Sequence, residues 1–221
     1  MDKSNTSINI DHHVSNPRFA DINIIDSEIS STCELVYNIL QDLKIKLGRK
    51  IATCIYAGIV TDTGSFSYDN TSSKTHDVVS YLLKAGAEKN KVHYNVYQNR
   101  KLDEVKLLGH VMTNMNTLMN NKVTLIEISK KLLNKFNLTY KDVDDAINFA
   151  RDIKGVEVAV VLKEVEKEEV KIGFRAKNNK DVNKIAKSLG GGGHIKASGA
   201  TIYKTLDETK KIVLEQLDEF F

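Results

Sequence analysis

Three consecutive residues near the start of the chain carry side chains that could bind a metal ion. Asp11, His12 and His13 follow the apolar run Ile8–Ile10. A strand that ends in one carboxylate and two imidazoles delivers them to the carboxyl edge of a sheet, where open α/β folds build their ligand sites. Imidazole mixed with carboxylate suits Mn²⁺ or a similar divalent ion. The tripeptide therefore predicts half of a metal site.

A further carboxylate, Asp62, lies in a polar loop directly after the apolar segment Ile51–Val60. By pattern alone this segment is a buried helix or a central strand, and its small residues favour a helix. Hydrolysis of a phosphate ester at neutral pH needs a metal ion that activates water and shields the phosphoryl oxygens. Asp62 and His12, with Asp11 as a third candidate, would supply ligands to such an ion, and His13 would donate to the phosphate or protonate the leaving group. The alternative is a partly exposed histidine cluster and a carboxylate that caps a turn.

A glycine run far downstream predicts an anion site. Gly190 to Gly193 are four successive glycines, followed by His194. Such a run strips a loop of every side chain that would keep a phosphate away from backbone N–H groups. The alternative is a helix stop followed by a flexible loop without a ligand.

The composition is that of a soluble globular protein. The 221 residues are 41% hydrophobic and 28% charged, which suits one large or two modest domains. No run approaches the roughly 18 apolar residues of a membrane span, and the polar start lacks the layout of a signal peptide. We therefore expect a cytoplasmic protein with no membrane partner. The net charge of +3 is too small to argue for long nucleic acid. Cys33 and Cys54 are expected to be buried free thiols.

Hydrophobic periodicity and capping residues divide the chain into two parts. Residues 1–112 read as strand-poor and helix-rich, with helices that begin after Ser31, over 51–60, over 75–85 and within 90–112. Residues 113–121 are polar and are predicted to be a linker. Residues 122–221 read as an α+β domain. Its expected strands are 123–128, 156–165, 170–174 and 200–203, and its expected helices are 130–136, 142–150, 182–189 and 207–221.

Three segments of the chain, taken in order, resemble a known family. Residues 8–17, 57–66 and 190–199 are similar to the third motif, the fourth motif and the C-terminal domain motif of DHH phosphoesterases. The closest resemblance is to the nano-RNase/pAp phosphatase group, which removes nucleotides from very short RNA and dephosphorylates 3′-phosphoadenosine 5′-phosphate (pAp). It implies an α/β fold, in which a doubly wound parallel-sheet DHH domain precedes a smaller α+β DHH-associated domain across a cleft. One alternative is a catalytically incomplete nucleotide-binding fragment, and another is a cyclic or linear dinucleotide phosphodiesterase of the same superfamily. A family II pyrophosphatase-like enzyme would lack the glycine-histidine loop.

The resemblance also implies roles for the metal-site residues. His12 and Asp62 would be metal ligands, with two ions, most suitably Mn²⁺, in a complete relative. His13 would contact the scissile phosphate, and Asp11 would support this pair of residues or orient a metal ligand. Relatives carry two aspartate-rich motifs before the Asp-His-His motif, which starts at residue 11 here. We therefore expect the DHH domain to lack its first strands and the metal pair to lose most of its carboxylates.

The second domain would supply the nucleotide-binding residues. The resemblance places Arg175 with the glycine loop and His194 on a nucleotide-binding face, where Gly191, Gly192 and Gly193 would offer backbone N–H groups. Short RNA oligonucleotides or mononucleotides are the implied partners, and two copies of the chain would pair as a homodimer. Arg100 and Lys196 are weaker candidates, for which a solvated surface role is the better interpretation.

Overall fold

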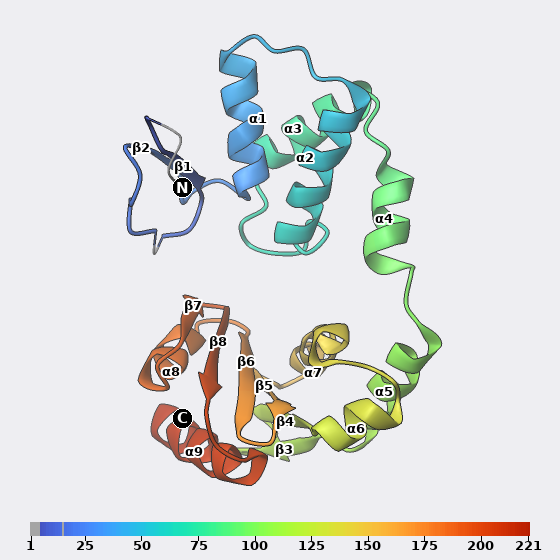
Figure 1. Ribbon diagram of the computed structural model, residues 1–221, viewed down its shortest axis with the longest axis vertical. Coiled ribbons are helices and arrows are strands. Elements are labelled where there is room, and N and C mark those ends of the chain that lie inside the picture. Colours follow the sequence, from blue (N-terminus) through green and yellow to red (C-terminus); the bar gives the residue numbers. More distant parts are fainter. Residues whose placement is uncertain (1–4, 15) are drawn as a thin grey trace. The chain divides into compact units, whose positions relative to one another are not determined.

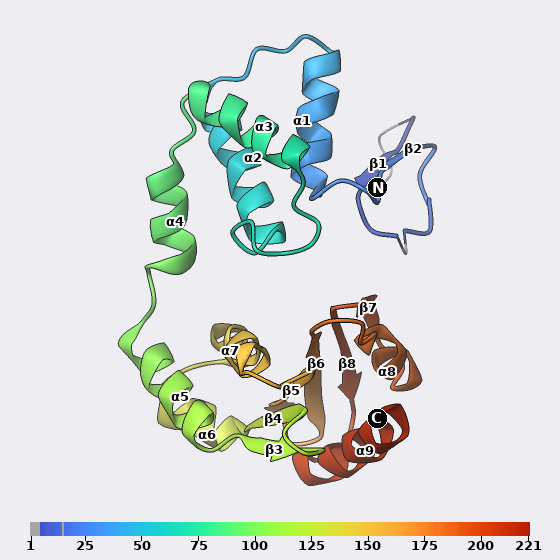
Figure 2. The same cartoon turned by 180° about the vertical axis from the view of Figure 1, so that it is seen from behind.

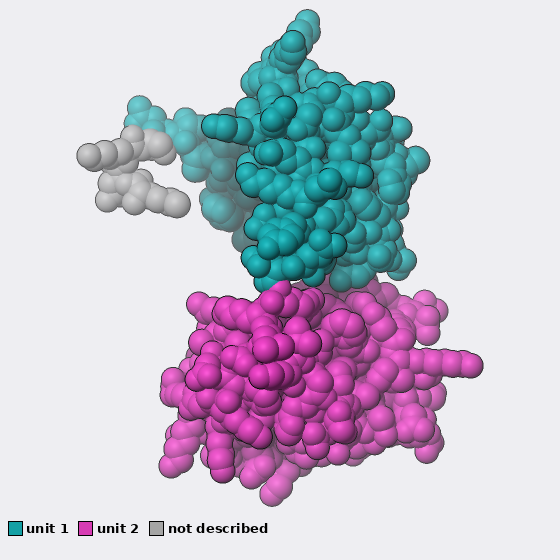
Figure 3. Space-filling view, turned by 90° about the vertical axis from the view of Figure 1, so that its right-hand side faces the viewer, with its two compact units in different colours: residues 1–99 teal, residues 100–221 magenta. Residues whose placement is uncertain are grey.

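The chain forms two compact units, which we describe separately. The computed structural model describes residues 5–14 and 16–221. Unit 1 comprises residues 1–99 and unit 2 comprises residues 100–221 (Figure 3). Both units combine helices with a sheet that contains parallel strands, which confirms the predicted α/β class.

The boundary between the units lies earlier than the predicted limit at residue 112. Helix α5 (Leu102–Thr113) belongs to unit 2, because its residues Leu107 and Val111 are buried in the same core as Ile126. Strand β3 (Asn116–Leu118) lies within the predicted linker and pairs with β4. The polar residues of this short edge strand are exposed, so they resemble a linker in the sequence.

Unit 1 has a small parallel sheet followed by helices (Figure 1). Strand β1 (Ile8–Asp11) pairs in parallel with β2 (Ile22–Ile25), a strand that the sequence did not predict. The helices are α1 (Thr32–Asp42), α2 (Arg49–Asp62), α3 (Ser73–Lys84) and α4 (Lys89–Tyr97). The predicted helix over 51–60 is confirmed as α2, and Ser31 caps α1 as predicted by accepting a hydrogen bond from the Glu34 N–H. Buried residues of α2, including Ile59, pack with those of α3, including Leu82.

The two cysteines are free, as expected, but only one of them is shielded. Cys33 is partly buried and Cys54 is exposed. The predicted burial of Cys54 is wrong because its side chain lies on an exposed side of α2, whose buried residues include Ala52 and Ile55.

Unit 2 is built on a sheet with the order β3-β4-β5-β6-β8-β7, in which only the β4–β5 pair is parallel. Its other strands are β4 (Val123–Ile128), β5 (Val158–Glu166), β6 (Glu169–Ala176), β7 (Gly192–His194) and β8 (Ala197–Ile202). Its other helices are α6 (Lys130–Lys135), a 3₁₀ turn (Tyr140–Val143), α7 (Ala146–Asp152), α8 (Val182–Ser188) and α9 (Leu206–Phe220). Figure 2 shows the same elements from behind. None of the helices in the described part of the chain is long and apolar enough to cross a membrane.

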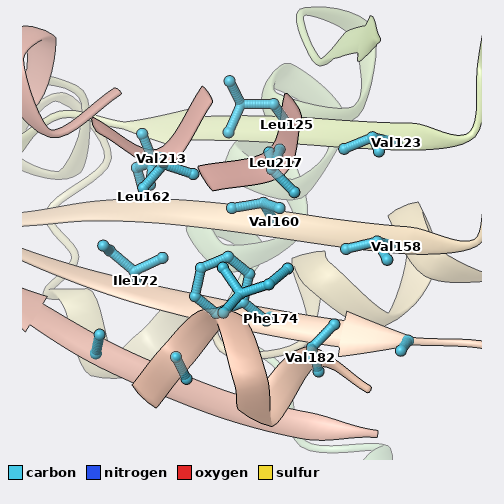
Figure 4. Close-up of a cluster of buried hydrophobic side chains, with 14 of the residues drawn as sticks. Val123, Leu125, Val158, Val160, Leu162, Ile172, Phe174, Val182, Val213 and Leu217 are labelled. Atoms are coloured by element: carbon cyan, nitrogen blue, oxygen red, sulfur yellow. The ribbon is translucent and has the colours of Figure 1, made fainter. Parts of the chain in front are cut away.

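Helices cover both faces of this sheet. Successive side chains of a strand point to opposite faces. Val160 of β5 and Phe174 of β6 are buried with residues of α8 and α9, including Val182 and Leu217 (Figure 4). The alternate β5 residue, Val161, is buried instead with residues of α5, α6 and α7. The face that carries Phe174 is therefore the α8–α9 face, and its neighbour Arg175 points to the opposite face.

One turn of unit 2 should respond to acid. Hydrogen bonds from the Thr139 hydroxyl and N–H and from Lys101 lower the pKa of Asp142 to about 2 from 3.8. The ionised carboxylate therefore stabilises unit 2 above about pH 4, and this stabilisation is lost as the pH falls through about 2. We expect Asp142→Asn to lower the melting temperature at pH 6 and to have a smaller effect at pH 3, as measured by circular dichroism. An equal effect at both pH values would contradict this assignment.

Candidate functional site

Both carboxylate oxygens of Asp11, at the carboxyl end of β1, take part in hydrogen bonds. Its Oδ1 accepts from the His12 N–H at 2.8 Å and lies 2.6 Å from His13 Nδ1. Its Oδ2 accepts from Asn16 Nδ2 at 2.6 Å. Burial alone would raise the pKa of Asp11, but the hydrogen bonds from His13, Asn16 and the His12 N–H together hold it well below its usual range. Asp11 is therefore an ionised group that orients the His13 ring through Nδ1.

His12 and Asp62 lie together although they are distant in the sequence. His12 Nε2 is 3.7 Å from Asp62 Oδ2. The His12 side chain is 14% exposed and that of Asp62 is 45% exposed, so the pair sits at the surface of unit 1 with the imidazole mostly covered. Helix α2 ends at Asp62, which presents its carboxylate beside the end of β1.

The His12–Asp62 pair suits part of a metal site. Imidazole nitrogen and carboxylate oxygen each bind divalent ions at about 2.0–2.2 Å, so two ligand atoms 3.7 Å apart fit one coordination sphere. Within residues 5–14 and 16–221, however, no three His, Cys, Asp or Glu side chains form a group that could hold a metal ion. The donor set has the right chemistry and fills only part of the sphere.

Two asparagines support this region, and the sequence analysis did not single out either. Asn16 Nδ2 donates to Asp11, and Asn70 Nδ2 donates to the Asp62 carbonyl oxygen at 3.2 Å. Asn16 precedes a proline, which is a signal for a turn but not for a contact with Asp11. Asn70 has no sequence signal, because its contact depends on how the loop after α2 folds.

Arg175 and His194 are aligned across three strands of unit 2. Arg175 of β6 is opposite Ala197 of β8, which is opposite His194 of β7. Residues directly opposite in antiparallel strands lie on the same face of a sheet. Arg175, Ala197 and His194 therefore share the face opposite to the α8–α9 face. The structure brings these two predicted nucleotide-binding residues into one row.

The neighbouring row on that face has no side chains. Gly173 of β6 is opposite Gly199 of β8, which is opposite Gly192 of β7. Helix α7 reaches the β6 end of this row, where a Cβ atom at Gly173 would lie 3.5 Å from Ile147. We call the row Gly173, Gly199 and Gly192 the glycine strip. The strip places no side chain of its own over the backbone beside Arg175 and His194.

Two of the predicted loop glycines are required by packing against β8. A Cβ atom at Gly191 would lie 2.1 Å from the Gly199 carbonyl oxygen. At Gly193 it would lie 2.6 Å from the Ala197 carbonyl oxygen, and the φ of +142° also favours glycine. The predicted loop is wrong for residues 192–194, because close approach of β8 turns them into the edge strand β7.

Gly192 is different from its two neighbours. The nearest atom to a Cβ built there would be Asn183 Oδ1 at 3.9 Å, which is ordinary contact. Neither packing nor backbone conformation therefore requires glycine at this position.

The two weaker candidates have structural contacts. Arg100 forms an ion pair with Asp145, in agreement with a surface role. The Lys196 carbonyl oxygen accepts a hydrogen bond from the Ala176 N–H at 3.0 Å, so its backbone helps to hold β6.

Comparison with known proteins agrees with this fold. The family model "DHH family, N-terminal domain" matches residues 1–59 and the model "DHHA1 domain" matches residues 120–221. A probable bifunctional oligoribonuclease and PAP phosphatase from Streptococcus mutans is 32% identical over 96% of this chain and 67% of its own length. A solved exopolyphosphatase-related protein from Bacteroides fragilis has a TM-score of 0.89 at 32% identity, over 96% of this chain and 63% of that one.

These matches define a two-domain α/β protein with a DHH and a DHHA1 domain. The chain belongs to the DHH family, which confirms the resemblance found in its motifs. The bifunctional oligoribonuclease and PAP phosphatase of Bacillus subtilis is 33% identical, and that of Thermus thermophilus is 31% identical. The chain spans 65% and 64% of the length of these two relatives.

Proposed function

We propose that this protein is a phosphoesterase that depends on a divalent metal ion and hydrolyses very short oligoribonucleotides, pAp or both. The observation that carries the proposal is the His12–Asp62 pair, which joins imidazole and carboxylate 3.7 Å apart at the end of a parallel strand. Family membership supports it, because the Bacillus subtilis relative is named a bifunctional oligoribonuclease and PAP phosphatase.

In this proposal the residues of unit 1 bind the ion and the reacting phosphate. His12 and Asp62 would hold the ion, and Mn²⁺ suits this mixture of ligands. When bound, such an ion lowers the pKa of a water molecule and neutralises charge on the phosphoryl oxygens. Asp11 fixes the His13 ring through Nδ1, and in this proposal Nε2 of that ring would donate to a phosphate oxygen or protonate the leaving oxygen.

Unit 2 would bind the nucleotide part of the substrate. The forked donors of Arg175 match the oxygens of a phosphate, and His194 lies in the same row. The glycine strip lets a ribose or base approach the backbone without meeting side chains.

A hydrolysis assay tests the proposed activity. The chain is incubated with Mn²⁺ and a labelled diribonucleotide, and in parallel with pAp. We expect turnover of at least one substrate, loss of turnover with a chelator, and recovery when Mn²⁺ is added back. Absence of turnover for both substrates would contradict the proposal.

A second candidate function is nucleotide binding without catalysis. The observation in its favour is that the described residues bring only part of a metal coordination sphere together. Calorimetric titration with AMP distinguishes the two functions, because this candidate predicts binding in a protein that turns over neither substrate.

Arg175 should contribute measurably to nucleotide affinity. We expect Arg175→Ala to weaken AMP binding about tenfold, since it removes hydrogen bonds from a charged donor worth about 1.5–3 kcal/mol. Lys171 is the matched control, because it is a cation on the same strand and the same face of β6. Lys171→Ala should leave the affinity unchanged within about twofold. Equal losses in the two variants would indicate a general effect of charge rather than a site at Arg175.

Two further expectations from the sequence stay predictions. We propose that the protein acts in the cytoplasm and that two copies pair. Sedimentation velocity over a range of concentrations tests the pairing, and a single species of monomer mass would contradict it.

A further inference from the structure

The loop that follows Asp62 has an unusual backbone. Gly64, Ser65 and Phe66 all adopt left-handed conformations, with φ of 54°, 57° and 69°. Residues other than glycine rarely adopt positive φ, and they do so mainly where the surroundings force the conformation. The proposed chemistry does not use these residues directly, so contacts from the surrounding structure must hold their conformation.

Thr63 fixes the first turn of this loop from inside unit 1. It is fully buried, and its hydroxyl donates to the Ile59 carbonyl oxygen at 2.7 Å. The same hydroxyl oxygen accepts from the Phe66 N–H at 3.1 Å. The Ser65 N–H donates to the Val60 carbonyl oxygen at 2.8 Å. These bonds fold the left-handed residues back onto the end of α2.

Asn70 fixes the other end of the loop. Its side-chain amide donates to the Asp62 carbonyl oxygen at 3.2 Å and to the Ser30 carbonyl oxygen at 2.8 Å. One side chain therefore ties the backbone of Asp62 to the turn before α1. No other side-chain donor to the Asp62 carbonyl is recorded among the described residues.

Glu34 anchors Ser30, one of the residues that accept a hydrogen bond from Asn70. Its side chain is buried, with the residue 4% exposed, and Oε2 accepts from the Ser30 hydroxyl and from the Thr75 hydroxyl at 3.0 Å. Thr75 also takes part in the capping box at the start of α3. Glu34 thus joins the turn that receives Asn70 to the helix that follows the loop. Hydrogen bonds therefore link Thr75 to Asp62 by way of Glu34, Ser30 and Asn70.

We propose that Asn70 is a positioning residue for Asp62, and that Glu34 supports it from within the core. Without the Asn70 amide, two carbonyl oxygens would lose their donor and the left-handed turn would be free to relax. The Asp62 carboxylate would then no longer be held beside His12. This inference rests on the proposed metal-dependent function, and it assigns to the network the role of fixing one ligand.

The test compares metal binding with the order of the loop. Mn²⁺ binding to Asn70→Ala is measured by electron paramagnetic resonance of the free ion, and amide hydrogen exchange at Ser65 and Phe66 is measured without metal. We expect Mn²⁺ affinity to fall about 10–100-fold, as for other groups that orient a metal ligand. Exchange at the two amides should rise at least about tenfold. Asn95→Ala is the control, because this exposed asparagine donates to the Lys91 carbonyl oxygen of its own helix, away from the loop after Asp62.

Variants at Glu34 keep the inference testable if Asn70→Ala folds poorly. Glu34→Gln retains an oxygen that can accept both hydroxyls and should bind Mn²⁺ within about threefold of the wild type. Glu34→Ala should lose affinity as Asn70→Ala does. The same loss in Glu34→Gln as in Glu34→Ala would overturn the role assigned to these hydrogen bonds.

Two negative results are distinguishable. If the wild type binds Mn²⁺ more tightly than Asp62→Ala does, and Asn70→Ala behaves as the wild type in binding and exchange, the positioning role is overturned while the metal site stands. If the wild type binds Mn²⁺ no more tightly than Asp62→Ala does, the proposed metal-dependent function fails, and the role of Asn70 toward a metal ligand fails with it.

Discussion

Asp62→Asn is expected to lower kcat/KM for Mn²⁺-dependent hydrolysis of a diribonucleotide by more than about 100-fold. Loss of a residue that only orients a ligand costs about 10–100-fold in metal affinity or activity, and loss of a charged ligand should cost more. Asparagine has nearly the same shape as aspartate, and the Asp62 carboxylate is 45% exposed, so unit 1 should fold normally. Initial rates at several Mn²⁺ concentrations measure the effect, and excess Mn²⁺ should restore part of the activity.

Asp77→Asn is the matched control for this experiment. Asp77 is an exposed carboxylate on α3 of the same unit. Its replacement removes the same charge from unit 1 and should leave kcat/KM within about twofold. Activity that survives in Asp62→Asn at limiting Mn²⁺ would show that this carboxylate is not a ligand.

The elements of unit 2 were largely predictable because their signals are local. Strand β4 was predicted at residues 123–128 and is found there. The helix predicted over 182–189 is found as α8, and the Asp181 side chain caps it by accepting from the Asn183 N–H. Apolar runs and capping residues act over a few positions, so they can be recognised without knowledge of the partner segments.

The short strands β2, β3 and β7 could not be predicted, because their pairing is tertiary. β3 and β7 have three residues each and contain mainly polar residues or glycine. β7 exists because β8 lies against it, and the requirement for glycine at 191 and 193 appears only in that contact. In the sequence the same glycines indicate a loop.

For the candidate metal site, the sequence singled out two side chains that lie close together, but it did not indicate their hydrogen-bond partners. His12 and Asp62 were named as ligands from their positions after two apolar segments, and they lie 3.7 Å apart. Both Asp11 carboxylate oxygens accept hydrogen bonds, because the loop after β1 brings the Asn16 side chain back to Asp11. The support of Asp62 by Asn70 and Glu34 depends on three segments that meet only in the folded unit.

Gly191→Ala and Gly192→Ala are expected to have different consequences, although the two glycines are adjacent. The first should lower stability and the second should weaken ligand binding. Alanine at 191 would place its Cβ 2.1 Å from the Gly199 carbonyl oxygen, so β7 and β8 must separate. Overpacking of this kind costs about 3 kcal/mol. For a unit of this size it should lower the melting temperature by roughly 10 °C. Thermal denaturation followed by circular dichroism measures this loss.

Gly192→Ala should leave stability intact and impair ligand binding. Its Cβ would have only Asn183 Oδ1 within 4 Å, at 3.9 Å, so the melting temperature should stay within about 2 °C of the wild type. The new methyl group would stand on the glycine strip beside His194, where it would hold a nucleotide away from the backbone. We expect AMP affinity to fall at least about tenfold, since each 1.4 kcal/mol of lost contact is a factor of ten. If Gly192→Ala binds AMP as the wild type does, the glycine run serves only the packing of β7 on β8, and the nucleotide must bind elsewhere.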